Sequence, residues 1–334
     1  MTTVLLTGAT GLIGSNIAAQ LLARGDKVRA LVRPSSDASP LQDMGVDIVR
    51  GDITEREDVL AAADGAEVVV HSAAVLGGAT QTAEEHRAVN VGGTANLMDA
   101  AAVVHARRVV TLSTTTFFDV STAPLSESSP LDPSPSDDPY TVTKLAAYKD
   151  AMARVERGQD ICVVISGGAY GPSPLPARSM VAPSFNARIC AAILGEVSDN
   201  VEFPIPWVYC EDVAAAAVSA IDRGRAGERY LAFGHPDDVG SMPFFCNRAA
   251  EIAGVDHRVT AISTDQLDDP AMLARFGPSL IALAKRKFPE PWFVADLTRE
   301  RLGYQPIRLD EGLRRTIPWL AEKGFLPDQF AQLP

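Results

Sequence analysis

A glycine-rich turn between a buried strand and a helix, near the start of the chain, constrains the fold most. Thr3 to Thr7 has the continuous apolar character of a buried parallel strand, and Leu12 to Arg24 has the pattern of a helix. The turn between them contains Gly8, Gly11 and Gly14. In such a unit the first glycine takes a sharp turn, the second lets the backbone approach a pyrophosphate, and the third lets the helix pack closely on the strand. The sequence therefore predicts a phosphate-binding helix N-terminus.

Strand and helix patterns alternate along the first half of the chain. A second strand, Lys27 to Val32, completes a strand–helix–strand unit with the first. Further strands are predicted at Val46 to Arg50, Val68 to His71, Arg108 to Leu112 and Ile161 to Ile165, and long helices at Glu84 to His105 and Tyr140 to Gly158. Helical crossovers of this kind go with a parallel sheet. The predicted fold class is α/β, a doubly wound parallel (Rossmann) sheet with a smaller, mostly C-terminal substrate-binding lobe.

We expect two parts in this chain. The dinucleotide-binding domain should comprise residues 1–171 and about 205–233, and the substrate lobe about 172–204 and 234–334. The lobe is the least informative part of the sequence. Several of its side chains could line a pocket but are as consistent with core or surface: Arg178, Met180, Phe185, Phe244, Phe245 and Trp292.

The residue after the second strand bears on the choice of cofactor. An acidic residue there hydrogen-bonds the ribose 2′-hydroxyl of NAD, whereas an arginine accommodates the 2′-phosphate of NADP. This chain has Arg33 at that point, and the flanking Leu31, Val32, Pro34, Ser35 and Ser36 include no carboxylate. We therefore expect NADP (NADPH) as the cofactor. NAD stays possible, because Arg33 could also be an ordinary surface arginine.

Tyr140 and Lys144 are spaced to share one face of the helix predicted from Tyr140 to Gly158. A free tyrosine, with a pKa near ~10, is a poor acid–base catalyst at neutral pH, and a lysine one turn away would help to lower that pKa. Such pairs also arise by chance on solvated helix faces. The preceding stretch, Ser121 to Pro139, is rich in Ser, Pro and Asp and predicts a loop that delivers Tyr140 to its helix. Its length suggests a lip over the site.

A series of short motifs follows the same order along most of the chain. They are the Gly8/Gly11/Gly14 turn, Gly51-Asp52-Ile53, His71-Ser72-Ala73-Ala74, Asn90-Val91-Gly92-Gly93-Thr94, Ser113-Thr114-Thr115, Tyr140-x-x-x-Lys144, Tyr170-Gly171-Pro172, Glu211-Asp212-Val213-Ala214 and Leu302-Gly303-Tyr304-Gln305-Pro306. Together they resemble the extended short-chain dehydrogenase/reductase family, within the NAD-dependent epimerase/dehydratase superfamily. The resemblance is to its dihydroflavonol-reductase-like and 3β-hydroxysteroid-dehydrogenase-like enzymes.

The resemblance implies a set of cofactor contacts. Asp52, with Ile53 beside it, would accept a hydrogen bond from the adenine, and Ala73 and Ala74 would lie along the ribose and phosphate side. Gly167 would lie near the nicotinamide, in a segment that lacks the proline usual in relatives and so has more backbone freedom. The other expected contacts are Gly8, Thr10, Gly11, Leu12, Ile13, Arg33, Tyr140 and Lys144. From the residues alone, Asp52 is equally a turn residue and the alanines are equally core residues.

The resemblance also implies a catalytic set. Thr115 falls where the family carries a serine that hydrogen-bonds the substrate oxygen, with Thr114 as the adjacent candidate and strand-end capping as the alternative. Tyr140 would donate the proton, Thr115 would polarise the carbonyl, and Lys144 would lower the tyrosine pKa and hold the nicotinamide ribose. Asn90 is expected mainly as a packing amide, though it could support a relay water, and His71 as a structural histidine.

The expected function is an NADPH-dependent carbonyl reductase, an oxidoreductase that interconverts a ketone or aldehyde and an alcohol by hydride transfer. The alternative is a nucleotide-sugar epimerase that retains bound NAD and shows no net redox, although Arg33 disfavours tightly held NAD. Thr116-Phe117 stands where sugar dehydratases of this family carry Asp-Glu, which argues against dehydration. A non-catalytic NADP-binding regulator usually loses the tyrosine or lysine, and both are present.

Composition limits the partners and the compartment. A net charge of −12 and a pI of about 4.9 argue against nucleic acid or an anionic membrane. The most apolar stretches, such as Val213 to Ile221, are much shorter than a bilayer span. Cys162, Cys190, Cys210 and Cys246 are widely spaced, which indicates neither zinc nor a disulfide framework. We expect a cytoplasmic enzyme with a small-molecule carbonyl or alcohol substrate and no metal; a homodimer is possible.

Overall fold

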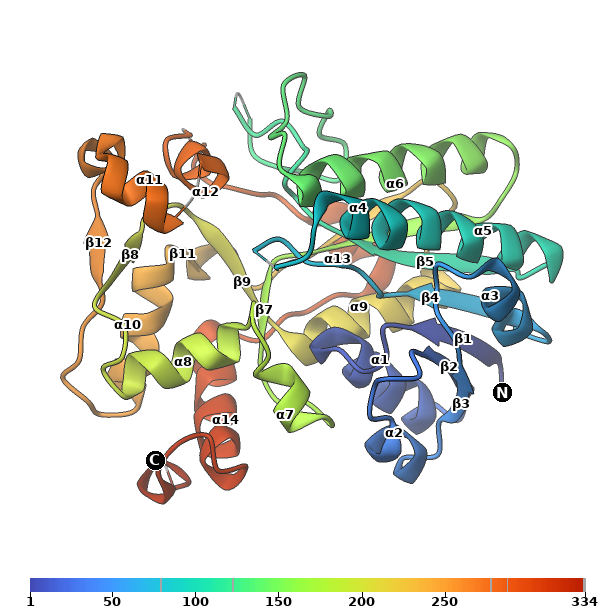
Figure 1. The fold of residues 1–334 in the computed structure, drawn as a ribbon, viewed down its shortest axis with the longest axis horizontal. Helices are drawn as coiled ribbons and strands as arrows, with labels where there is room; N and C mark the ends of the chain where they lie inside the picture. Colours follow the sequence, from blue (N-terminus) through green and yellow to red (C-terminus); the bar gives the residue numbers. More distant parts are fainter. Residues whose placement is uncertain (79, 122, 277, 287, 333–334) are drawn as a thin grey trace.

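A seven-stranded parallel sheet forms the centre of the larger lobe, called here the sheet lobe (Figure 1). The computed structural model describes residues 1–78, 80–121, 123–276, 278–286 and 288–332, so parts of the predicted 121–139 loop and 234–334 lobe lie outside the described residues. The strand order is β10-β6-β5-β4-β1-β2-β3. The strands are β1 (Thr3–Thr7), β2 (Lys27–Val32), β3 (Asp47–Arg50), β4 (Val68–His71), β5 (Arg108–Ser113), β6 (Ile161–Ser166) and β10 (Arg229–Ala232). All their pairings are parallel, so the predicted doubly wound α/β fold is confirmed.

Helices cover both faces of this sheet because successive strand residues point to opposite sides. Val4 and Leu6 belong to a core with one set of helices, and Leu5 belongs to a core with the other set. The first set is α1 (Leu12–Ala23), α2 (Ser39–Asp43) and α9 (Cys210–Arg223); the second is α3 (Arg56–Ala63), α5 (Thr94–Val103) and α6 (Pro139–Glu156). Both faces of β1 are thus sealed, which fits its uninterrupted apolar sequence.

The helix predicted from Glu84 to His105 is not continuous. It divides into α4 (Ala83–His86), a π-helical segment η1 (Arg87–Gly93) and α5. A side chain at Gly93 would lie 2.7 Å from a methyl carbon of Ile53, so the segment passes close to the loop that follows β3. A π-helical turn re-aims side chains relative to an α-helix, and such segments occur often at functional sites. The hydrophobic pattern carried no sign of this interruption.

The chain changes direction across the sheet between β3 and β4. It runs outward from β1 through β2 to β3 and then returns to β4 on the other side of β1. Gly8, just after β1, has a φ of +75°, and a Cβ there would lie 2.6 Å from Ala73 N in the loop after β4. The two loops are therefore in backbone contact at the carboxyl edge. In open α/β sheets such a switch point is where ligands bind.

A second lobe, called here the C-terminal lobe, lies on the left of Figure 1. Its helices and strands are α7 (Pro176–Ser179), α8 (Phe185–Ile193), β8 (Asp199–Val201), η2 (Pro236–Asp238), β11 (Val239–Gly240), α10 (Met242–Ile252), β12 (Thr260–Ile262), η3 (Thr264–Asp268), α11 (Pro270–Phe276), α12 (Pro278–Ala284), α14 (Leu309–Glu322) and η4 (Asp328–Phe330). A three-stranded sheet of β7 (Gly168–Tyr170), β9 (Ile205–Tyr209) and β11 joins it to the sheet lobe. Trp207 and Phe245 stack with ring centroids 3.9 Å apart in its core.

The chain crosses back from the C-terminal lobe to the sheet lobe before α14. Leu125 exchanges backbone hydrogen bonds of 2.9 and 2.8 Å with Trp292 and Val294, which pins the loop between β5 and α6. Trp292 is accordingly buried among aromatic side chains. The following helix, α13 (Asp296–Leu302), packs against α9 and β10. None of the helices among the described residues combines the length and apolar character needed to span a membrane.

Replacing Gly14 with alanine tests the close packing of α1 on β1. A Cβ at Gly14 would lie 2.1 Å from the carbonyl oxygen of Gly8, and neither backbone segment can move freely. We expect Gly14→Ala to lower the free energy of unfolding by about 2–3 kcal/mol, measured by urea denaturation. Gly92→Ala is the matched control, since a Cβ there meets its nearest atom only at 4.0 Å. Equal stability of the two variants would contradict this packing.

Candidate active site

Tyr140 lies in the first turn of α6, at the carboxyl edge of the sheet. The helix begins there because Asp138 accepts a hydrogen bond of 3.0 Å from Thr141 N, and Pro139 occupies the first helical position. The Tyr140 ring is edge-on to His86, with centroids 6.5 Å apart. A Cβ on Gly77 would lie 3.1 Å from the Tyr140 ring, so the loop after β4 also packs against this ring. Nothing in the sequence pattern had indicated His86 as a neighbour of Tyr140.

The side chain of Thr114, just after β5, lies close enough to the Tyr140 hydroxyl to lower its pKa. Burial raises the pKa of Tyr140 above its ordinary value of 10; the Thr114 side chain acts in the opposite direction, and the Asp138 charge raises it further. Thr115 lies one residue on and its carbonyl accepts a hydrogen bond of 3.1 Å from Phe118 N. The sequence analysis assigned Thr115 to the serine position, with Thr114 as the adjacent candidate. The proximity to the Tyr140 hydroxyl favours Thr114. The role of either residue in catalysis stays a prediction.

Lys144 is buried one helical turn after Tyr140. Its ammonium donates a hydrogen bond of 2.8 Å to the Leu112 carbonyl at the end of β5. Burial lowers the pKa of Lys144 to about 8. Burial raises the pKa of Tyr140, and the Lys144 ammonium is directed at a backbone carbonyl, so a lowering of the tyrosine pKa by this lysine stays a prediction. The pair is therefore a protonated phenol beside an ammonium that loses its proton easily.

His71, at the end of β4, is held between two threonines. Its Nδ1 is 2.7 Å from Thr7 Oγ1 and its Nε2 is 2.8 Å from Thr94 Oγ1. The Thr94 hydroxyl donates its own hydrogen to the Asn90 carbonyl, so His71 Nε2 must carry the proton and Nδ1 must accept from Thr7. Burial, followed by the charge of Lys144, lowers the pKa of His71 to about 3. These contacts describe a neutral, structural histidine.

Asn90 ties the loop after β4 to α6. Its side-chain oxygen accepts from Val75 N at 2.8 Å, and its amide donates to Val75 O at 3.0 Å and to Thr143 Oγ1 at 3.1 Å. The π-helical segment η1 turns this amide inward, where it is almost completely buried. Asn90 thereby positions the loop that touches Tyr140, in keeping with a packing amide.

The N-terminus of α1 has the properties of an anion site. Gly11 is its N-cap and offers no side-chain cap, and the first turn contains no acidic residue. Thr10, Leu12 and Ile13 are only partly buried around it. Free N–H groups and the positive end of the helix dipole favour a phosphate at such a position.

The residues expected near the adenosine lie at the ends of β2 and β3. Arg33 is exposed, and within the part of the chain that the structure describes its guanidinium has no hydrogen-bond or ion-pair partner. Asp52 Oδ1 accepts hydrogen bonds of 2.9 Å from both the backbone N–H and the hydroxyl of Thr54, which is the geometry of a turn residue. Ile53 is buried against η1.

The remaining residues expected to contact the cofactor lie where backbone segments approach closely. Ala73 and Ala74 are partly buried in the loop after β4, opposite Gly8. A Cβ at Gly167 would lie 2.0 Å from the Pro206 carbonyl oxygen, so this glycine lets β7 pack on β9. Their contacts with a cofactor stay predictions. No group of three or more His, Cys, Asp and Glu side chains among the described residues could hold a metal ion.

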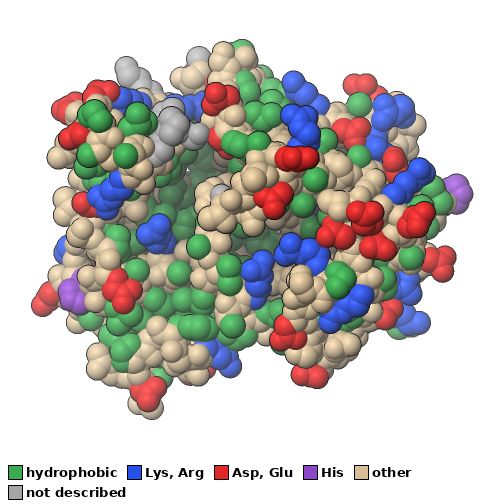
Figure 2. Space-filling view, in the orientation of Figure 1, with side chains coloured by type: hydrophobic (Ala, Val, Ile, Leu, Met, Phe, Trp, Pro, Cys, Tyr) green, Lys and Arg blue, Asp and Glu red, His purple; other side chains and the backbone are tan. Residues whose placement is uncertain are grey.

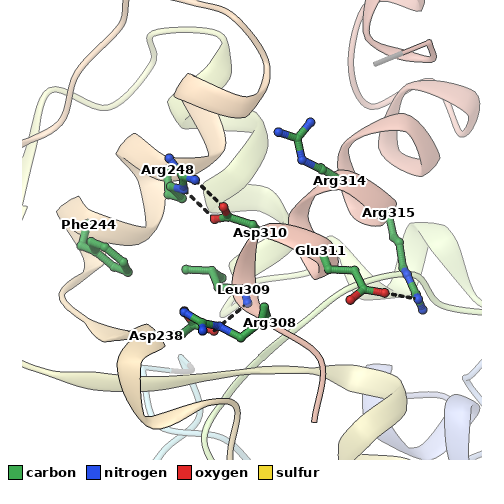
Figure 3. Close-up of a pocket in the computed structure, with 9 residues that line it drawn as sticks. All are labelled: Asp238, Phe244, Arg248, Arg308, Leu309, Asp310, Glu311, Arg314 and Arg315. Carbon is green, nitrogen blue, oxygen red and sulfur yellow. Dashed lines mark hydrogen bonds and ion pairs between the residues drawn. The ribbon is translucent and has the colours of Figure 1, made fainter. Parts of the chain in front are cut away.

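Figure 2 shows the molecule hollowed between the two lobes, with hydrophobic side chains visible inside the hollow. A separate charged depression of about 630 Å³ lies at the start of α14 (Figure 3). It is lined by Asp238, Phe244, Arg248, Arg308, Leu309, Asp310, Glu311, Arg314 and Arg315. Arg248 pairs with Asp310, Arg315 with Glu311, and Arg308 donates to Asp238 at 2.9 and 2.8 Å. These pairs hold η2, α10 and α14 together, so the charged side chains that line the depression have a structural role.

Three polar side chains thus lie at the carboxyl edge of the sheet that also holds the start of α1: a tyrosine, a threonine just after a strand, and a buried lysine. The model of the NAD dependent epimerase/dehydratase family matches residues 4–232. The chain belongs to this family. The resemblance to extended short-chain dehydrogenases/reductases is thereby confirmed, including its dihydroflavonol-reductase-like and 3β-hydroxysteroid-dehydrogenase-like members. Membership makes the protein an NAD(P)-dependent enzyme that acts on CH–OH and C=O groups.

Similar proteins span nearly the whole chain. Sterol demethylase protein B of Methylococcus capsulatus is 34% identical and covers 97% of this chain and 100% of its own. The 4-hydroxy-2-methyl-3-oxo-4-farnesyl-3,4-dihydroquinoline-1-oxide ketoreductase of Stigmatella aurantiaca is 33% identical over 75% of this chain and 78% of its own. The solved structure of the Bordetella bronchiseptica enzyme WbmH in complex with NAD⁺ has a TM-score of 0.73 at 20% identity, covering 97% and 100%. This last likeness shows the fold alone.

The buried His71 predicts acid sensitivity. Its folded-state pKa of about 3 lies below the ordinary 6.5, so the unfolded chain binds the extra proton between these values. The contribution of His71 to the free energy of unfolding is therefore fully present above pH 6.5. It falls as the pH drops towards 3, by up to ~1.4 kcal/mol per pH unit. In urea titrations at pH 7, 6, 5 and 4.5, we expect His71→Gln to show a shallower loss than wild type. His105→Gln, an exchange of an exposed histidine, should keep the wild-type dependence on pH. A His71→Gln profile parallel to wild type would contradict the neutral assignment.

Proposed function

We propose that the protein is an NADPH-dependent reductase that interconverts a ketone or aldehyde and an alcohol by hydride transfer. The observation that carries this proposal is the placement of Tyr140 in the first turn of α6, with the Thr114 side chain near its hydroxyl and the buried Lys144 one helical turn away. A carbonyl oxygen seated at these two hydroxyls would receive two hydrogen bonds as negative charge develops on it. Bound NADPH supplies the hydride.

Tyr140 is the proton donor in this scheme. Its raised pKa keeps the phenol protonated at neutral pH, which suits the reduction of a carbonyl. In the reverse direction the phenolate is needed, so oxidation of the alcohol is favoured at alkaline pH. The Thr114 hydroxyl stabilises the phenolate that proton donation leaves behind. Lys144, with a pKa of about 8, adds positive charge at neutral pH and can return a proton to the site.

The choice of NADP over NAD rests on Arg33. Its exposed guanidinium follows β2 and has no partner within the described residues, so it is available to a 2′-phosphate. The family binds nicotinamide dinucleotides of both kinds, and WbmH was solved with NAD⁺. Asp52 lies next along this edge, and Oδ2, the oxygen not used by Thr54, would accept from the adenine.

The substrate in this proposal is a large apolar molecule with a ring carbonyl. The two relatives above are named for a sterol and for a farnesylated quinoline, and each spans three quarters or more of this chain. The hollow between the lobes exposes hydrophobic side chains, which suits such a molecule. The competing function, epimerisation of a nucleotide sugar with retained NAD, is favoured by the family description and by the shared fold of a solved nucleoside-diphosphate-sugar epimerase.

Turnover of NADPH tests the function directly. We expect wild-type protein to consume NADPH with cyclic ketones of the sterol and isoprenoid classes, and Tyr140→Phe to lose at least ~100-fold in kcat because it lacks the proton donor. NADPH binding by Tyr140→Phe, measured by fluorescence titration, should stay within about threefold of wild type, since the ring is retained.

Bound cofactor is identified in the same preparation after denaturation. Recovery of stoichiometric NAD, with no turnover of free NADPH on any ketone or aldehyde, would establish the epimerase alternative instead. Activity of Tyr140→Phe within about threefold of wild type would remove Tyr140 from the catalytic role while leaving the family assignment intact.

Paired valine variants decide which threonine acts on the substrate oxygen. Valine keeps the branched shape and removes the hydroxyl. We expect Thr114→Val to lower kcat by roughly 100-fold, as for loss of one oxyanion donor, and Thr115→Val to stay within about threefold of wild type. The reverse order would return the role to Thr115, the position first assigned from the sequence. Cofactor affinity, measured for both variants, controls for local distortion.

A further inference from the structure

Two arginines stand side by side at the carboxyl edge of the sheet. Arg33 follows β2 and Arg50 is the last residue of β3, and in the parallel register Arg50 pairs with Val32. β2 lies between β1 and β3, so these arginines share the edge that carries the turn at Gly8 and the start of α1. Only Arg33 was singled out from the sequence, because Arg50 looks there like an ordinary strand-end residue.

Arg50 closes the turn that carries Arg33. Its Nη1 donates to the Arg33 carbonyl at 3.2 Å and to the Ser36 carbonyl at 2.7 Å. The same Arg33 carbonyl accepts from Ser36 N at 3.0 Å. One nitrogen of the guanidinium thus fixes the ends of the Arg33–Ser36 turn. Its Nε and Nη2 have no partner within the ranges that the structure describes, so part of the planar fork faces outward.

Neither arginine forms an ion pair with its described surroundings, although one carboxylate lies near Arg50. Asp37 lies within electrostatic reach of Arg50, but its Oδ1 accepts from Ser39 N at 2.9 Å and from Ser39 Oγ at 2.7 Å. Across the described ranges, neither Arg33 nor Arg50 forms an ion pair, although the chain carries a net charge of −12. Figure 2 shows Lys and Arg side chains along the sheet-lobe border of the hollow. Two adjacent unpaired guanidiniums suit a dianionic phosphate, which a single arginine does not neutralise.

We propose that Arg50 is a specificity-determining residue for NADP: it holds the Arg33 turn through Nη1 and offers its remaining N–H groups to the adenosine 2′-phosphate. The inference rests on the proposed use of NADP and adds a residue to it. Arg33 supplies one cation from an exposed, partnerless side chain, and Arg50 supplies a second cation and the rigidity of the turn. Removal of Arg50 should therefore weaken ligands that have a 2′-phosphate and spare those that lack it.

Binding of cofactors and of adenosine fragments tests this inference without any turnover. Dissociation constants are measured for NADPH, NADH, adenosine 2′,5′-bisphosphate and 5′-AMP with wild type, Arg33→Met, Arg50→Met and Arg50→Lys. Lys27→Met is the matched control, since it removes an exposed positive charge at the start of β2, about 20 Å from Arg33. We expect Arg50→Met to weaken NADPH and the bisphosphate at least ~10-fold and NADH and AMP less than about twofold.

The other variants separate charge from positioning. Arg50→Lys keeps the charge but not the fork, so we expect a loss between wild type and Arg50→Met; Lys27→Met should match wild type for all four ligands. Equal weakening of NADPH and NADH by Arg50→Met, or no change in either, overturns the inference. A wild-type protein that binds AMP as tightly as the bisphosphate overturns the use of NADP itself, and this inference with it. A wild type that prefers the bisphosphate, with Arg50→Met unaffected, overturns the inference alone.

Discussion

Backbone packs directly against backbone where β1 and β4 end, and the arrangement of the site depends on this contact. A Cβ at Gly8 would lie 2.6 Å from Ala73 N, and one at Gly14 would lie 2.1 Å from Gly8 O. The first approach seats the loop after β4 beside the turn after β1, and the second fixes the start of α1. Asn90 then joins the same loop to α6, because its side chain bonds the Val75 backbone and the Thr143 hydroxyl. The position of Tyr140 relative to the start of α1 thus depends on Gly8 and Gly14, which lie 132 and 126 residues before it in the sequence.

Burial, more than pairing of charges, sets the electrostatics at the catalytic pair. Lys144 is buried with its ammonium on the Leu112 carbonyl, and its pKa falls to about 8; the pKa of Tyr140 rises. A neighbouring His71 stays neutral, which limits the repulsion that a second buried cation would cause. A lysine in such surroundings costs stability that a purely structural residue would not cost. Its retention one turn from a tyrosine is understandable if the pair serves proton transfer.

The sheet could be predicted from the sequence because its signals are local. The bounds of β1, β2 and β4 agree with those predicted, since the apolar residues of each strand stand out from the residues around it. The sequence could not tell which threonine lies beside the Tyr140 hydroxyl, because Thr114 and Thr115 are chemically alike. The answer depends on the direction in which the backbone leaves β5. The π-helical segment was invisible for a similar reason: it packs where Gly93 meets Ile53, a contact between segments far apart in the sequence. In the C-terminal lobe, aromatic residues such as Phe245 proved to be core, a distinction that needs tertiary contacts.

The central claim is that Tyr140 and its neighbours transfer hydride and proton in one net redox reaction. Transfer of deuterium from [4,4-²H₂]NADPH to product, followed by mass spectrometry, measures this most directly. The account predicts one deuterium on the carbinol carbon of the alcohol and one NADP⁺ formed for each alcohol. Deuterium retained in the cofactor, with substrate isomerised and no NADP⁺ accumulated, would contradict it.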